Sequence, residues 1–268
     1  MIRGVIFDLG GTLVDKYSLS PLVNLNKAFL KNNIRLSNTL ISRDMGMKKM
    51  DHIYHLSKEP SFREQFITIY NRPHSNDDLS DIYDDFCKLQ NYYLKHHLDI
   101  IPETIDTIRL LQKRDIKIGI TTGFNKEQMN LCLDFLKKYD IEVDSSVSSS
   151  CVNGPSRPDP LMVYENMKQM GLTDPKSILK VDDTCVGILE GVHAGCLTVG
   201  VARWSINMNV HSMDQKENLD YETKVGDLDY DESRQLVKDK LKKSRLQLHT
   251  AEPTYSVSYT HLRAHETS

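Results

Sequence analysis

The sequence has no long apolar run, no cysteine motif and little net charge. No apolar stretch approaches the roughly 20 residues that span a membrane, and the N-terminus enters a strand pattern without signal-peptide features. The five cysteines include no CxxC, which argues against a zinc site and for a reducing compartment. A net charge of −3 gives no reason to expect a nucleic-acid or membrane partner. We therefore expect a cytoplasmic protein that binds neither nucleic acid nor a membrane.

The composition is that of a soluble globular protein. The 268 residues are 39% hydrophobic and 26% charged. This length allows one large domain or two modest ones, with a sizeable buried core. The division into domains must therefore come from the order of the apolar patterns along the chain.

Helical and strand patterns follow one another in a characteristic order. Apolar residues recur at helical spacing within 18–98, for example at Leu22, Leu25 and Phe29. Strand runs then alternate with helices; the runs are Val5–Phe7, Ile116–Ile120, Ser177–Val181 and Leu197–Val201. This order predicts an α/β fold with a doubly wound parallel sheet and an inserted α-helical cap. We expect a core domain of 1–17 and 99–255, a cap of 18–98, and a tail of 256–268 that lacks apolar periodicity, does not pack, and is disordered or non-native.

Asp8 follows the first strand run, and Gly10, Gly11 and Thr12 come directly after it. Ligands of open α/β sheets bind at the carboxyl ends of the strands, where a glycine-rich turn lets backbone N–H groups approach a phosphate. A carboxylate at this edge can attack phosphorus and form an aspartyl-phosphate. The alternative is an Asp that merely caps a strand-end turn.

Two further strand ends and one loop carry polar residues. Thr121 and Thr122 can bind a phosphoryl oxygen, although a Thr at such a turn is often only a helix cap. Asp182 and Asp183 suit Mg²⁺, although a lone Asp-Asp pair is often a solvated turn. Arg157 offers a fork of donors for phosphate and carboxylate, or is a loop arginine.

Asp8, Thr121, Arg157 and Asp183 stand in the order of the motifs of the haloacid dehalogenase superfamily, and the segment around Asp8 resembles its first motif. Within that superfamily, residues 2–201, and more thinly those to 255, resemble the phosphonoacetaldehyde hydrolase family. Gly10 carries part of this resemblance, because many phosphatases have a second Asp there. The remaining matching segments are Met45–His52, Lys117–Gly123, Arg157-Pro158, Lys180–Thr184, Glu190–Gly195 and Thr198–Val201.

The resemblance implies hydrolysis of phosphonoacetaldehyde to acetaldehyde and phosphate. It makes Lys49 the Schiff-base lysine and His52 a residue that assists proton transfer. Without the resemblance, both residues would be interpreted as belonging to a solvated helix face. It assigns Mg²⁺ to Asp8, the backbone carbonyl of Gly10, and Asp183, and it implies a homodimer through the cap. Substrate or phosphate binding would fall to Gly10, Gly11, Thr12, Met45, Thr121, Thr122 and Arg157. A protonated imine accepts the electrons of the carbon–phosphorus bond, so an acid at position 10 is unnecessary.

Four positions depart from the family. Asp182 stands where the family has Gly, and Gly187 where it has a second carboxylate. Phe124 replaces a tyrosine, and Tyr17 replaces a smaller residue. Two alternatives therefore stay open: a phosphatase or phosphotransferase acting on a small phosphate ester, and a catalytically silent relative that binds a phosphorylated ligand.

Overall fold

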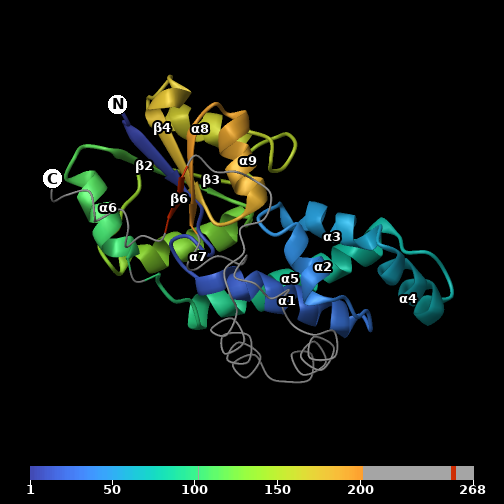
Figure 1. Ribbon diagram of the computed structural model, residues 1–268. Coiled ribbons are helices and arrows are strands. Elements are labelled where there is room, and N and C mark those ends of the chain that lie inside the picture. The colour runs from blue at the N-terminus through green and yellow to red at the C-terminus, as the bar shows by residue number, and fades with distance from the viewer. Residues whose placement is uncertain (102, 202–254, 258–268) are drawn as a thin grey trace.

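A parallel sheet forms the centre of the computed structural model, which describes residues 1–101, 103–201 and 255–257 (Figure 1). The strand order is β3-β2-β1-β4-β5-β6, and every pairing is parallel. The strands are β1 (Gly4–Phe7), β2 (Lys117–Thr122), β3 (Ser145–Ser148), β4 (Ile178–Asp182), β5 (Leu197–Val201) and β6 (Tyr255–Val257). The first strand of the chain is therefore central. Strands β2 and β3 lie on one side of β1 and strands β4, β5 and β6 lie on the other, so the order of the strands reverses at β1.

The register of the three central strands brings their carboxyl ends to one place. Phe7 of β1 is aligned with Ile120 of β2 and with Val181 of β4. The next residue of each strand, Asp8, Thr121 or Asp182, consequently lies at the same edge of the sheet. This is the edge at which the sequence predicts the site.

Helices cover both faces of the sheet, as a doubly wound fold requires. They are α6 (Thr104–Gln112), α7 (Lys126–Lys137), α8 (Leu161–Gln169) and α9 (Cys185–His193), with a short 3₁₀ turn at Pro175–Ser177. Side chains alternate along β1, so Val5 and Phe7 join the apolar cluster under α6 and α7, whereas Ile6 packs with α8. No helix among the described residues is long and apolar enough to cross a membrane.

Five helices between β1 and β2 form a separate apolar cluster beside the sheet (Figure 1). They are α1 (Leu19–Lys31), α2 (Asn38–Arg43), α3 (Lys49–Ser57), α4 (Pro60–Tyr70) and α5 (Asn76–His96). Buried aromatic side chains hold this cluster together, with Phe62 in edge contact with Phe29 and stacked on Phe66. These helices lie within the span in which the sequence predicts a cap.

A buried polar network joins this helical block to the loop after β1. The Asp15 carboxylate accepts hydrogen bonds from the Ser20 hydroxyl at 2.6 Å and the Tyr93 hydroxyl at 2.9 Å. Asp15, Tyr17 and Ser18, in and before a 3₁₀ turn at Lys16–Ser18, all have positive φ angles. Such backbone costs energy in residues other than glycine, and here it turns Ser18 toward the site described below.

The end of the chain differs from our expectation. Residues 255–257 form β6, paired in parallel with Val199–Val201, whereas we expected no packing from residue 256 onward. The pairing shows that β structure extends two residues into the expected tail. Residues 258–268, the rest of that tail, lie outside the described residues.

Candidate active site

Asp8 is buried at the carboxyl end of β1, with 6% of its surface exposed. Its backbone N–H donates to the carbonyl of Val181, and its Oδ1 accepts a 2.7 Å hydrogen bond from Nη1 of Arg157. Burial, and then the negative charge of Asp182, raises the pKa of Asp8 to about 6, although Arg157 and Lys180 act in the opposite direction. Asp8 is therefore a carboxylate whose ionisation depends on nearby positive charge.

Arg157 connects the ends of two strands. It is almost completely buried and donates from Nη2 to the Thr121 hydroxyl at 2.6 Å as well as from Nη1 to Asp8. Burial alone would lower its pKa, but the charges of Glu190, Asp8 and Asp182 outweigh that effect and raise it. A permanently charged fork beside Asp8 and Thr121 can bind the oxygens of a phosphoryl group.

Three carboxylates, from Asp8, Asp182 and Asp183, present oxygens within 4.8 Å of one another. Asp183 is buried and accepts long hydrogen bonds, both 3.3 Å, from the hydroxyls of Thr12 and Ser18. It therefore points into the cluster and not into solvent. Three buried acidic groups at this spacing favour a bound cation, and hard carboxylate oxygens are the ligands that Mg²⁺ prefers.

Asp182 is less available to a cation than Asp183. Its Oδ2 accepts a 2.6 Å hydrogen bond from Lys180, and its Oδ1 accepts from the backbone N–H and the hydroxyl of Thr184 at 2.9 and 2.7 Å. Lys180 and Arg157 lower the pKa of Asp182 against the effect of burial. Of the three carboxylates, those of Asp8 and Asp183 are consequently the more available to a metal.

Gly11 allows the loop after β1 to pass close to Asp183. Its φ is +75°, and a Cβ at this position would overlap the Asp183 carboxylate and lie 2.6 Å from the Ser18 hydroxyl. Only glycine can adopt this positive φ without strain and also leave room for the Asp183 carboxylate.

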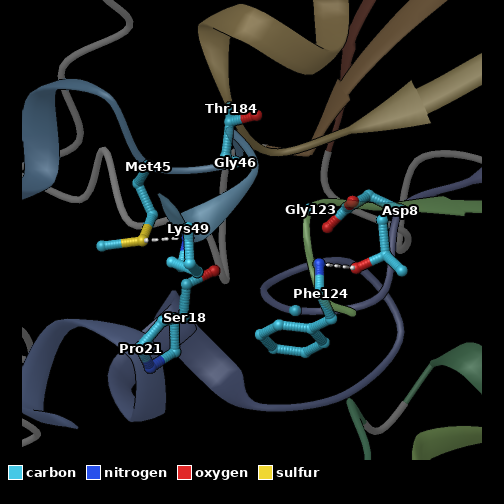
Figure 2. A pocket seen from close by; sticks show the side chains of 11 residues that line it. Asp8, Ser18, Pro21, Met45, Gly46, Lys49, Gly123, Phe124 and Thr184 are labelled. Atoms are coloured by element: carbon cyan, nitrogen blue, oxygen red, sulfur yellow. Dashed lines mark hydrogen bonds between the residues drawn. The ribbon is translucent and has the colours of Figure 1, made fainter. Parts of the chain in front are cut away.

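Lys49 begins α3 and is buried, with 4% of its surface exposed. Its Nζ lies 3.6 Å from the Met45 sulfur, a contact drawn in Figure 2, and 3.4 Å from the Met47 carbonyl. Burial lowers the pKa of Lys49 to about 8, and the charge of Asp8 opposes this only in part. A larger fraction of the amine is therefore neutral, and nucleophilic, near neutral pH than in an ordinary lysine.

Asp8 and Lys49 line the same cavity, which is partly open to solvent (Figure 2). The other lining residues are Gly10, Ser18, Pro21, Met45, Gly46, Thr122, Gly123, Phe124 and Thr184. Both the helical block and the sheet edge thus contribute walls.

The two walls approach each other at backbone level. A Cβ on Gly123 would overlap the carbonyl of Gly46 and lie 2.6 Å from that of Met47. Arg157 also donates to the Gly46 carbonyl at 3.4 Å. The loop before α3 therefore rests directly on the site residues of the sheet.

The predicted residues do not all reach the cavity. Gly10, Met45 and Thr122 line it together with Asp8 and Lys49, while Gly11, Thr12, Thr121, Arg157 and Asp183 lie outside the lining. Thr121, Arg157 and Asp183 connect to Asp8 through the contacts given above, and Thr12 through its bond to Asp183. The sequence interpretation did not select Ser18, Pro21 or Thr184, because none carries a pattern of its own.

His52 is fully buried and lies outside the cavity lining. Neither ring nitrogen has a hydrogen-bond partner among the described residues, and the backbone of Ile41 interacts with the ring without normal hydrogen-bond geometry. Burial first, and then the charge of Lys49, lowers the pKa of His52 well below its usual value. The imidazole is therefore neutral, one helical turn from Lys49.

Known proteins resemble this chain over most of its length. The family model of the haloacid dehalogenase-like hydrolases matches residues 2–195. A phosphonoacetaldehyde hydrolase of Bacteroides fragilis is 33% identical over 207 residues, covering 77% of this chain and 78% of that relative. One of Vibrio cholerae is 31% identical over 201 residues, covering 75% and 74%. The crystal structure of a phosphonoacetaldehyde hydrolase-like protein of Oleispira antarctica superimposes with a TM-score of 0.79 at 24% identity, over 98% of this chain and 90% of that one.

Proposed function

Because the chain belongs to the haloacid dehalogenase-like hydrolases, we propose that it hydrolyses the carbon–phosphorus bond of phosphonoacetaldehyde, giving acetaldehyde and phosphate. The observation that carries the proposal is the shared cavity of Asp8 and Lys49. A carboxylate nucleophile alone serves many phosphoryl transfers. A buried lysine with a lowered pKa facing the same cavity suits a substrate that has a carbonyl group, because a neutral amine condenses with a carbonyl to form an imine.

The first step falls to Lys49. Its neutral amine attacks the aldehyde carbon. The adduct takes up one proton and loses the former carbonyl oxygen as water, which leaves a protonated imine. The pKa of about 8 leaves roughly a tenth of the lysine neutral at pH 7, which is far more than an ordinary lysine provides. The thioether of Met45, 3.6 Å from Nζ, limits where the amine can point.

Asp8 then attacks phosphorus. The new oxygen–phosphorus bond forms while the carbon–phosphorus bond breaks, and its electron pair moves toward the iminium nitrogen to give an enamine. This leaving group needs no proton in the same step, which is consistent with Gly10 at the position two residues after Asp8. Arg157 and Thr121 lie where they can hold two phosphoryl oxygens.

Two hydrolytic steps complete the reaction. The enamine takes a proton on carbon, and water then releases acetaldehyde and the free lysine. A second water hydrolyses the aspartyl-phosphate to phosphate, so the net consumption is one water per substrate. We propose neutral His52 as a proton acceptor in these steps. Its ring lies outside the cavity lining, so a proton must reach it through water or after a side-chain rotation.

We propose Mg²⁺ as the cofactor, held by Asp8, Asp183 and the carbonyl of Gly10. Three buried carboxylates within 4.8 Å of one another fit a divalent cation. A bound Mg²⁺ supplies positive charge that keeps Asp8 ionised and offsets the charge of the phosphoryl oxygens. Asp182 accepts hydrogen bonds from Lys180 and Thr184. It would therefore add negative charge next to the metal without being a main ligand.

Ester hydrolysis is less well supported than carbon–phosphorus cleavage. An alkoxide leaving group requires an acid, and Asp8 is the only carboxylate among the described residues that line the cavity. The silent-relative alternative is also weakened, because Asp183 lies in the acidic cluster. The expected homodimer and cytoplasmic location stay predictions.

An assay with two matched substrates tests the proposal. Phosphonoacetaldehyde and glycolaldehyde phosphate both carry an aldehyde, but they differ in having a carbon–phosphorus or an ester bond. We expect equal amounts of phosphate and acetaldehyde from the first, little release from the second, and loss of turnover in Asp8→Asn or with a chelator. Faster release from the ester, or no release from phosphonoacetaldehyde, would disprove the proposal.

A further inference from the structure

Three buried carboxylates surround Arg157. Its Nη1 lies 2.7 Å from Asp8 and 3.6 Å from Asp182, and its Nε lies 2.9 Å from Oε2 of Glu190. Glu190 and Asp182 are both completely buried. An arginine drawn toward them would leave the phosphoryl side of the site, so something must limit their pull.

Lys180 lies among the same carboxylates and does not line the cavity. It is fully buried, and its Nζ is 2.6 Å from Oδ2 of Asp182 and 3.6 Å from Oε2 of Glu190. Burying a charged lysine in a central strand is costly unless it is paired with opposite charge. It therefore balances the two carboxylates that do not face the substrate.

Helix α9 is shaped to admit these charged side chains. A Cβ on Gly191 would lie 2.7 Å from Cβ and 2.8 Å from Cγ of Lys180. A Cβ on Gly187, one turn earlier, would overlap the Asp182 carboxylate. Glycine inside a helix lowers its stability relative to alanine. The side chains of Lys180 and Asp182 consequently fit only because the facing helix has glycine at both positions.

We propose that Lys180 is a positioning residue for Arg157. By balancing the charges of Asp182 and Glu190, Lys180 keeps these carboxylates from drawing the guanidinium away from Asp8 and Thr121. The role rests on the proposed function in one respect, namely that Arg157 binds the phosphoryl group. Lys180 does not line the cavity and touches neither substrate nor cofactor in this role.

Binding of inorganic phosphate in the presence of Mg²⁺, measured by calorimetry, tests the role without requiring turnover. Lys180→Met should weaken phosphate binding by about tenfold or more, the size of effect seen when supporting residues of a site are removed. Lys180→Met combined with Glu190→Gln removes one buried charge of each sign and should recover most of the affinity. Lys117→Met, which breaks a surface ion pair with Asp144 at 2.7 Å, is the matched control and should bind phosphate normally.

The outcomes separate the two proposals. A folded Lys180→Met protein with wild-type phosphate affinity, or a double variant as weak as the single one, would overturn the role of Lys180. If the single variant does not fold, the double variant decides: binding within about threefold of wild type supports the role, and weaker binding overturns it. A wild-type protein that binds phosphate but does not cleave phosphonoacetaldehyde would disprove only the proposed function. Wild-type protein that cleaves phosphonoacetaldehyde but binds no phosphate would overturn only the role of Lys180.

Discussion

The carboxylate of Asp182 occupies the space in which a side chain at Gly187 would begin. The two positions lie on β4 and α9, and Asp182 belongs to the acidic cluster with Asp8 and Asp183. The family that the sequence resembles has Gly at the first position and a carboxylate at the second. The structure therefore explains Gly187 as the counterpart of Asp182: this chain has one acidic side chain in that space, carried by the strand instead of the helix.

This relationship predicts coupling between the two positions. Gly187→Asp should destabilise the fold by about 1–3 kcal/mol through overpacking. Asp182→Gly should cost about 3–5 kcal/mol, because it removes the partner of buried Lys180. We expect the double variant to be more stable than the sum of these effects by at least about 1 kcal/mol. Urea unfolding of the four proteins measures the coupling, and strictly additive free energies would contradict this explanation.

The reactivity of Lys49 should depend on pH in a specific range. Its pKa is lowered from 10.5 to about 8. The neutral amine is therefore the main form from about pH 8 upward, whereas an ordinary lysine is mainly neutral only above its higher pKa. Reductive labelling with acetaldehyde and borohydride should therefore accelerate about tenfold per pH unit below 8 and then level off. Using acetaldehyde avoids the ionisation of a phosphonate. A labelling rate that still rises at pH 10 would show that Lys49 is not desolvated.

The positions around Asp8 could be predicted because parallel strands end at one edge of the sheet. That rule was enough to place Thr121 and Asp183 beside Asp8. Other parts had no such rule. Strand β3 is mostly serine and lacks an apolar run, and the roles of Lys180 and Glu190 depend on which side chains meet across β4 and α9.

Sequence spacing alone also cannot decide which of two adjacent lysines, Lys48 or Lys49, faces the site. Adjacent helical residues point about 100° apart, yet both lysines are helical neighbours of His52, at four and three residues. The structure gives a difference in burial: Lys49 is buried and lines the cavity, whereas Lys48 is partly exposed and does not. Which face of the segment meets the sheet depends on the packing of the whole helical block.

Phe124 is expected to limit binding of the substrate. It lines the cavity, and its Cζ lies 3.9 Å from the position of a Cβ on Gly10. Phe124→Tyr would place a hydroxyl at that end of the ring, where the resembling family has one. One added hydrogen bond should raise kcat/KM for phosphonoacetaldehyde by about 2- to 10-fold, with little change in Tm. Unchanged or lower kcat/KM would show that this hydroxyl has no partner in the substrate.

Two truncations define how much of the C-terminus the fold needs. We expect removal of 258–268 to leave Tm and activity nearly unchanged, because that segment has no apolar periodicity. Removal of 255–268 also deletes β6 and its pairing with β5, and should cost at least about 1–2 kcal/mol. Thermal unfolding of both proteins measures the difference. Equal stability of the two would mean that β6 contributes nothing.

Trapping of the imine tests the central claim most directly. Borohydride added together with phosphonoacetaldehyde should inactivate the protein and attach a two-carbon group to one peptide, with the modification on Lys49 by mass spectrometry. Lys48→Arg should be labelled like wild type, because Lys48 does not line the cavity. Lys49→Arg should be neither labelled nor active. Label on Lys48, or full activity in Lys49→Arg, would contradict the Schiff-base mechanism at Lys49.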